Sequence, residues 1–278
     1  MHRIKTAEKL ITLGFLLMAC TGCTRYQDMA DNAGLKTSII EGTIYRHRIY
    51  RHQPSGPERP PERWHVYIEG DGRAVTAAGT PSLDPTPRTP LLLPMMALDP
   101  QPALYLGRPC YFHTSDPRCS PLNWTLARYS EATVASMAAA LEKALGTDTP
   151  VTLIGHSGGG TLAVLLAPRL PQVDQVVTLA GNLQVGKWTA YHHYSPLTLS
   201  LDPGRLPPLP ADIRQYHLAG ARDREIHCHW IREYAETQPG SHFQQVSGAD
   251  HRTGWPPWWT LINLEPTIKT QRCDKVTR

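Results

Sequence analysis

The sequence predicts an α/β protein whose central sheet is mostly parallel and carries helices on both faces. Short apolar runs typical of strands alternate along the chain with stretches in which apolar residues follow helical spacing. One of these strands leads directly into a glycine-rich turn and a helix-compatible stretch. No internal repeat and no clear linker divides the 278 residues, a length that one large domain can fill.

The composition excludes several classes of protein. Hydrophobic residues make up 41% of the chain and charged residues 19%, which excludes an intrinsically disordered chain and a multi-span membrane protein. The formal net charge is +4 without a dense block of Lys and Arg, so a dedicated nucleic-acid-binding protein is not favoured. Six cysteines are too few, at this length, for a small fold built on disulfides.

Residues 1–19 are typical of an export signal. Three cations in the first nine residues precede an uncharged, mostly apolar run over residues 10–19. That run is far shorter than the roughly 20 residues that a membrane-spanning helix needs. We therefore expect a signal peptide rather than a core helix or a membrane anchor.

The segment Leu17–Cys20 resembles the bacterial lipobox, in which the cysteine is acylated and becomes the new N-terminus. Cys23 is the competing candidate, since it follows a small residue but lacks the aliphatic residue three positions before it. We expect lipidation of Cys20, with Cys23 as the alternative, and a polar tether over residues 20–37. Because Thr21 rather than Asp follows Cys20, the resemblance implies the outer membrane, with the protein facing the periplasm.

The remaining residues, 38–278, are expected to form a single domain. A strand pair is predicted at residues 38–40 and 44–50, around a Glu-Gly turn. Further strands are predicted at residues 64–69, 103–106, 151–154, 175–179, 212–218 and 243–246, from β-branched or alternating apolar runs. Helices are predicted at residues 129–145, 158–170 and 258–264, from the spacing of their apolar residues, with Ser130 as a candidate N-cap. Pro-rich insertions near residues 76–102 and 184–210 break this rhythm, and long connections of this kind are usually functional or mobile.

The segment Gly155–Gly159 (GHSGG) follows the predicted strand at residues 151–154 and precedes a predicted helix. This is the G-x-S-x-G arrangement in the strand–turn–helix setting that raises a serine hydroxyl above a sheet. Glycines at both flanking positions are needed because side chains there would collide with neighbouring backbone. The pattern predicts Ser157 as a nucleophile and the Gly158 amide as an oxyanion donor at the start of the helix.

A serine nucleophile needs a base, and the base needs an orienting carboxylate. Asp223 follows the predicted strand at residues 212–218, and His251 follows the next predicted strand. Both therefore lie beyond the C-terminal ends of strands, where the catalytic groups of open α/β sheets collect. Asp250 is a rival acid, but side chains adjacent in sequence usually point apart. We predict Ser157, Asp223 and His251 as a catalytic triad.

A second oxyanion donor is expected from the loop after an earlier strand. The segment Trp64–Gly72 (WHVYIEGDG) supplies this loop, and we predict the Asp71 amide as the donor. Glu69 stands where a histidine is common in such loops. His156, inside the predicted turn, is expected to pack rather than act.

With these residues, the chain resembles the α/β-hydrolase superfamily and, more narrowly, the exported proteobacterial α/β-hydrolase lipoproteins of undefined substrate. The segments that carry the resemblance are Val66–Arg73, Leu104–Cys110, Gly155–Gly160, Leu179–Asn182, His192–Leu197 and Leu218–Asp223. The resemblance implies the α/β-hydrolase fold and a Ser–His–Asp triad at Ser157, His251 and Asp223. It implies no particular substrate, because this fold carries many activities.

The remaining cysteines indicate an oxidising compartment. Cys110 and Cys119 enclose eight residues, a spacing that suits a local disulfide, with metal ligation or free thiols as alternatives. Cys228 and Cys273 are the leftover pair, whose bridge would tie the C-terminal tail to the region after Asp223. His227 and His229 would share one face of an extended segment, but no third ligand is evident. We expect no metal and no cofactor.

These features predict a lipid-anchored serine hydrolase that cleaves an ester, thioester or amide of an acyl-bearing small molecule through an acyl-enzyme intermediate. Its partners would be that substrate and the membrane, through the N-terminal lipid, and no nucleic acid. Two alternatives remain at this point: a non-catalytic envelope lipoprotein that uses the same scaffold to bind a partner or ligand, and an enzyme that transfers the acyl group to an acceptor other than water.

Overall fold

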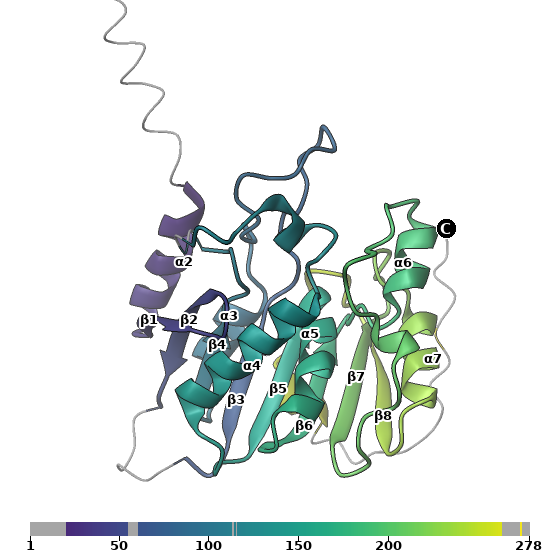
Figure 1. Ribbon diagram of the computed structural model, residues 1–278. Helices are drawn as coiled ribbons and strands as arrows, with labels where there is room; N and C mark the ends of the chain where they lie inside the picture. The colour runs from purple at the N-terminus through teal and green to yellow at the C-terminus, as the bar shows by residue number, and fades with distance from the viewer. Residues whose placement is uncertain (1–20, 55–60, 113, 115, 263–272, 274–278) are drawn as a thin grey trace, which may run out of the picture.

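The computed structural model describes residues 21–54, 61–112, 114, 116–262 and 273, and within them the chain forms an eight-stranded sheet (Figure 1). The strand order is β1-β2-β4-β3-β5-β6-β7-β8. The strands are β1 (Lys36–Glu41), β2 (Arg46–His52), β3 (Trp64–Ile68), β4 (Ala103–Leu106), β5 (Val151–His156), β6 (Val173–Leu179), β7 (Arg214–Gly220) and β8 (Ser241–Val246). From β4 to β8 neighbouring strands are parallel, and β1 and β2 form an antiparallel edge. The predicted mostly parallel sheet is confirmed.

Helices cover both faces of this sheet, as predicted. The α-helices in the described residues are α2 (Thr21–Asn32), α3 (Leu92–Ala97), α4 (Glu131–Leu145), α5 (Gly158–Leu166), α6 (Val185–Tyr191), α7 (Cys228–Glu236) and α8 (Trp258–Ile262). Buried residues of α4, α5 and α7 form one hydrophobic core, and those of α2, α3 and α8 contribute to a second core. Strand β3 serves both cores, because Val66 and Ile68 belong to the first and Tyr67 to the second.

The predicted strands and the helix α4 agree with the structure to within a few residues. Ser130 is the N-cap of α4, and its hydroxyl accepts a hydrogen bond from the Thr133 amide. The helix predicted at residues 158–170 ends as an α-helix at Leu166 and continues as one 3-10 turn, Ala167–Arg169. The last two residues of the helix predicted at 258–264 lie outside the described residues.

The prediction of a polar tether over residues 20–37 is wrong from residue 21 onward. Thr21–Asn32 forms the helix α2, and β1 begins at Lys36. The helix packs on the domain because Tyr26, which is 1% exposed, and Ala30 lie four residues apart on one helical face. The Tyr26 ring meets the Phe112 ring edge-on, with 4.8 Å between centroids, and this burial holds the segment against the sheet.

Besides α2, three further helices were not predicted. Helix α7 starts at Cys228, and α3 and α6 lie inside the two Pro-rich insertions. Each is short, so the repeat of apolar positions on which a helix prediction depends is brief. Within the described residues, no helix combines the length and the apolar character needed to cross a membrane. The expected signal peptide and Cys20 lie outside the described residues.

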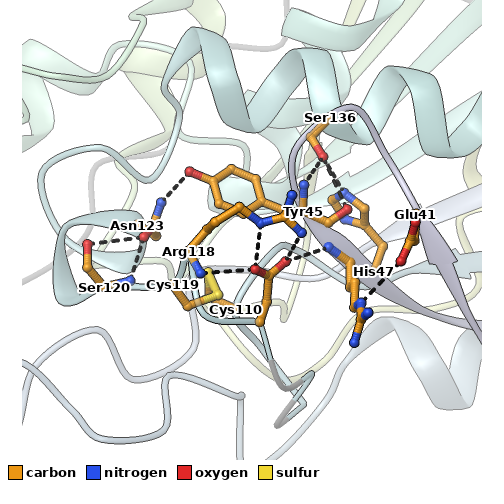
Figure 2. A network of polar contacts seen from close by, with 11 residues as sticks. Glu41, Tyr45, His47, Cys110, Arg118, Cys119, Ser120, Asn123 and Ser136 are labelled. Carbon is orange, nitrogen blue, oxygen red and sulfur yellow. Dashed lines mark hydrogen bonds and ion pairs between the residues drawn. A yellow bond between two sulfur atoms is a disulfide. The ribbon is translucent and has the colours of Figure 1, made fainter.

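The predicted Cys110–Cys119 disulfide forms, and Cys228 and Cys273, whose pairing the sequence left open, form a second bridge. The first closes a loop that is tied to the antiparallel edge of the sheet, as Figure 2 shows. Asp116, inside the loop, accepts hydrogen bonds from the Arg118 side chain and from the Arg46 amide of β2. Beyond the loop, the Asn123 amide donates to the Tyr45 hydroxyl at 2.8 Å. The disulfide loop is therefore anchored by polar contacts as well as by its bridge.

Candidate active site

The turn between β5 and α5 holds Ser157 in a backbone conformation that few residues adopt. Its φ angle is 53°, in the left-handed region, which residues other than glycine rarely adopt because of strain. A Cβ atom on Gly155 would lie 2.2 Å from the Gly159 carbonyl oxygen, and one on Gly159 would lie 1.9 Å from the Ile68 carbonyl oxygen. Both glycines are therefore required by close backbone approach, as the sequence predicted.

The structure brings Ser157, His251 and Asp223 into one hydrogen-bonded chain. His251 Nε2 lies 3.1 Å from Ser157 Oγ, and His251 Nδ1 lies 2.9 Å from Asp223 Oδ2. The three residues follow β5, β8 and β7, so their side chains meet at the C-terminal edge of the sheet. A carboxylate only accepts, so Nδ1 donates to Asp223, and Nε2 is left to accept the serine proton.

The Asp223 carboxylate is fixed by its own turn. Its side chain is fully buried, and Oδ1 accepts hydrogen bonds from the Glu225 and Ile226 amides at 2.8 and 2.9 Å. Oδ2 is thereby directed at His251. The rival acid Asp250 is engaged elsewhere, because its carboxylate accepts hydrogen bonds from the amides of the next turn, at Arg252 and Thr253. Among these two acids, the geometry matches the predicted choice of Asp223.

His156 and Glu69 form hydrogen bonds that fix the backbone around the site. His156 Nε2 donates to the His251 carbonyl at 2.7 Å, which fixes the backbone that carries the base. Its Nδ1 lies 3.5 Å from Glu69 Oε1. Glu69 Oε2 accepts hydrogen bonds from the Leu91 and Leu92 amides, where α3 starts. His156 packs, as predicted, and the carboxylate of Glu69 holds α3 against the end of β3.

Asp71 is held by a group of side chains that the sequence interpretation missed, which we call the Asp71 clamp: Arg108, Arg128, Tyr129 and Tyr111. Arg108 donates to Asp71 Oδ1, and Arg128 and Tyr129 donate to Oδ2 at 2.9 and 2.6 Å. The Tyr111 hydroxyl donates to the Asp71 carbonyl oxygen at 2.9 Å. Both the side chain and the peptide of Asp71 are therefore held in place.

The clamp keeps the Asp71 carboxylate ionised, and the two positive charges of the clamp exceed the single negative charge of the carboxylate. Burial by itself would raise the pKa of this carboxyl, but the guanidinium groups of Arg108 and Arg128 hold that pKa well below its usual range. A Cβ atom on Gly158 would lie 2.1 Å from Asp71 Oδ1, so the carboxylate packs directly against Gly158. Two cations around one anion leave an excess positive charge beside the two amides predicted to bind the oxyanion.

A cleft of about 970 Å³ opens above Ser157 and His251. Both Pro-rich insertions contribute to its walls, the first through a loop at residues 73–89 and the second through Trp188 and His193–Ser195. His192, in contrast, turns toward the Glu225 carbonyl oxygen and contacts it through Nε2 at 2.8 Å. The insertions thus shape the space in which a substrate would lie.

The extended histidine pair considered from the sequence does not form. His227 directly precedes α7 and His229 lies in its first turn. Over the part of the chain that the structure describes, no three His, Cys, Asp or Glu side chains gather as a metal site would require.

Comparisons with known proteins agree with this architecture. The family model described as "alpha/beta hydrolase fold" matches residues 111–237, a range that includes Ser157 and Asp223 and stops before His251. No curated protein matches the sequence.

Several solved structures share the fold. The chain is similar to a candidate lipase from Acinetobacter baumannii, with 14% identity, a TM-score of 0.55 and coverage of 82% of this chain and 89% of that one. It is similar to a structure described as a membrane phospholipase A and bacterial virulence factor, with 16% identity, a TM-score of 0.54 and coverage of 87% and 89%. It is also similar to the naproxen esterase of Bacillus subtilis, with 13% identity, a TM-score of 0.52 and coverage of 82% and 91%.

At these low sequence identities, the similarity to the solved structures shows the fold alone. The strand order, the sharp turn at Ser157 and the matched family model agree with one another. The chain has the α/β-hydrolase fold.

Proposed function

We propose that the protein is a serine hydrolase that cleaves an ester, thioester or amide through an acyl-enzyme intermediate. One observation carries this proposal: the unbroken hydrogen-bonded chain from Ser157 Oγ through His251 to the buried Asp223 carboxylate, at the floor of an open cleft. A serine in a strained turn, a base within reach and an oriented acid are the three parts that nucleophilic acyl transfer needs.

In the first half of the reaction, Ser157 Oγ attacks the acyl carbonyl carbon while its proton moves to His251 Nε2. Asp223 stabilises the resulting imidazolium through Nδ1. The negative charge that develops on the carbonyl oxygen is bound by the amides of Gly158 and Asp71. Collapse of the tetrahedral intermediate breaks the bond to the leaving group, which takes the proton from His251.

In the second half, water attacks the acyl-serine carbonyl and gives its proton to His251. The intermediate collapses, Ser157 leaves and recovers that proton, and the acid product is released. The Asp71 clamp supports both halves, because it holds the Asp71 peptide at one orientation and adds positive charge near the oxyanion. No other group of the chain is needed to balance the protons.

We also propose that the protein is anchored by lipid on Cys20, with Cys23 as the alternative, in the outer membrane and facing the periplasm. Two disulfides and the lipobox-like segment support an oxidising, exported location. Intact mass analysis of the membrane fraction, with Cys20→Ser and Cys23→Ser variants, tests this. Loss of the acyl mass in Cys20→Ser alone supports the assignment, and an unacylated wild-type protein contradicts it.

A fluorophosphonate probe tests the catalytic proposal. Wild-type protein should be labelled covalently, and Ser157→Ala should lose the label while retaining the same far-UV circular dichroism. A folded wild-type protein that resists labelling would instead favour a non-catalytic lipoprotein that binds a ligand. If labelling occurs, product analysis with added alcohols or amines separates hydrolysis from acyl transfer.

A further inference from the structure

The mouth of the cleft presents arginines whose role the acyl-transfer chemistry does not explain. Arg73, Arg88 and Arg252 all line the cleft that holds Ser157 and His251. In the part of the chain that the structure describes, none of the three side chains forms an ion pair with a carboxylate. Their guanidinium groups are therefore available to a ligand.

The carboxylates that line the same cleft are already engaged. Glu69 accepts hydrogen bonds from two backbone amides at the start of α3, and Asp71 accepts hydrogen bonds from the arginines of its clamp. Glu225 accepts a hydrogen bond from the Trp188 indole at 3.0 Å. The acidic groups thus have partners within the protein, whereas three of the basic groups do not.

The backbone positions of Arg73 and Arg88 are fixed by the loop that carries them. The Arg73 amide donates to the Pro85 carbonyl at 2.9 Å, and a Cβ atom on Gly72 would lie 2.9 Å from Pro87 Cδ. The two legs of the loop are therefore packed together, so residues 73 and 88 start from neighbouring backbone. This loop rises from the C-terminal edge of the sheet, beside the site (Figure 1).

Arg252 approaches from the other side of the site. It directly follows His251, and its amide donates to Asp250 Oδ1 at 2.8 Å, which fixes the turn. Two segments of the chain thus bring cations to the cleft that holds the proposed nucleophile and base. A guanidinium group recognises phosphate and carboxylate oxygens through paired hydrogen bonds and carries its charge at every physiological pH.

We infer that the substrate is an acyl ester bearing an anionic group, phosphate or carboxylate, which Arg73, Arg88 and Arg252 bind at the mouth of the cleft. The inference rests on the proposed serine hydrolase and adds its substrate class. The anionic group could belong to a water-soluble ester or to a lipid headgroup.

The test compares two soluble esters that differ in the anionic group, 1-butyrylglycerol 3-phosphate and 1-butyrylglycerol, with the full-length protein in detergent. The wild type should have the higher kcat/KM on the phosphate ester. In Arg73→Gln/Arg88→Gln/Arg252→Gln, the ratio of the two kcat/KM values should fall by about tenfold, because charge-assisted hydrogen bonds are lost. The control Lys36→Gln/Lys143→Gln/Arg214→Gln removes as much charge from exposed positions away from the cleft and should leave the ratio unchanged.

A second arm identifies the source of the anion, using vesicles of phosphatidylglycerol or phosphatidylcholine. Faster hydrolysis of phosphatidylglycerol than of the soluble phosphate ester assigns the anion to a lipid headgroup, and the reverse order assigns it to a soluble ester. A phosphate-to-neutral ratio that is equal in the wild type and the arginine variant overturns the inference. Fluorophosphonate labelling of Ser157 is measured on the same samples, so failure of the serine hydrolase itself is seen separately.

Discussion

Two carboxylates lie at the same edge of the sheet, the buried Asp223 after β7 and the partly buried Asp71 after β3, and their surroundings differ in origin and in charge. Asp223 is held by amides two and three residues further along its own turn and faces a single imidazole. Asp71 is held by Arg108, Arg128 and Tyr129, which lie 37, 57 and 58 residues away in sequence.

This difference in charge is consistent with the assignment of Asp223, and not Asp71, to the proposed triad. Asp223 has no permanent cation against it, so its charge is available to stabilise His251 when the imidazole takes up a proton. The charge of Asp71 is already outweighed by two guanidinium groups that lower the pKa of its carboxyl. Asp71 therefore serves as a fixed anchor for its peptide, and its interactions stabilise the fold.

Of the substitutions that distinguish the two carboxylates, we expect Asp223→Asn to have the largest effect, a loss of catalysis. Asp223→Asn should lower kcat by about 10³- to 10⁴-fold, because the amide cannot stabilise the imidazolium and favours the wrong tautomer. The Glu225 and Ile226 amides can still donate to the remaining side-chain oxygen, so stability should change little. Steady-state kinetics with a short-chain ester, together with urea unfolding, measure both quantities. Near-wild-type activity would mean that another acid orients His251.

For Asp71 we expect the opposite: a substitution should affect the stability of the fold more than kcat. Asp71→Asn leaves two buried guanidinium groups without a counter-charge and should lower the free energy of unfolding by about 3–5 kcal/mol. As a matched control, Asp174→Asn removes a partly exposed partner of Arg63 and should cost less than about 1 kcal/mol. Urea denaturation compares the two variants, and equal losses would contradict the buried clamp.

The two disulfides sharpen the comparison, because Cys110 is close in sequence to two residues of the Asp71 clamp and Cys228 follows the turn of Asp223. Arg108 and Tyr111 flank Cys110, so Cys110→Ser/Cys119→Ser should lower stability by about 2–3 kcal/mol and should also lower kcat by loosening the clamp. Cys228→Ser/Cys273→Ser should lower stability while kcat stays within about twofold of the wild type, because the contacts of Asp223 are local. Kinetics at a temperature where both variants are folded decide between these outcomes.

The smallest predicted effect concerns pH and lies away from the site. Burial lowers the pKa of His47 from 6.5 to about 4. Its ring contacts the Gly107 carbonyl and the Ser136 hydroxyl, the second of which Figure 2 shows. Below pH 6.5 the unfolded chain binds a proton at this residue that the folded chain does not, so stability falls as the pH drops toward 4. At pH 5 the loss from this residue should be about 2 kcal/mol. Urea unfolding at pH 5 and pH 7 should show a smaller difference for His47→Gln, and an unchanged difference would contradict the neutral buried ring.

The residues of the proposed triad could be singled out from the sequence because each follows a strand whose pattern is local. Ser157 lies in a five-residue motif between a strand and a helix, and Asp223 and His251 each follow an apolar run. The parallel topology then brings three strand ends together without any further information. The close spacing of Cys110 and Cys119 predicted the local disulfide, whereas Cys228 and Cys273 were the leftover pair and their bridge stayed open.

The Asp71 clamp could not be predicted, because its partners come from distant parts of the chain. In the sequence, Arg108 and Arg128 lie in loop segments, and no residue close to them in sequence indicates a buried ion pair. Helix α2 was missed for a different reason: its sequence is polar on average, and Tyr26 and Ala30 were the available signal of a buried face. Local patterns thus predicted the strands and the residues of the proposed triad, whereas the Asp71 clamp and the packing of α2 depend on tertiary contacts.

The most direct test of the account is to identify the atom that carries the acyl group. The protein is mixed with 4-nitrophenyl acetate, quenched in acid within milliseconds to seconds, digested and examined by mass spectrometry. We predict an acetyl group on Ser157, accompanied by a burst of 4-nitrophenol close to one equivalent of protein, and neither in Ser157→Ala. Turnover of the ester without an acetylated Ser157 peptide, or with the acetyl group on another residue, would contradict the proposed mechanism.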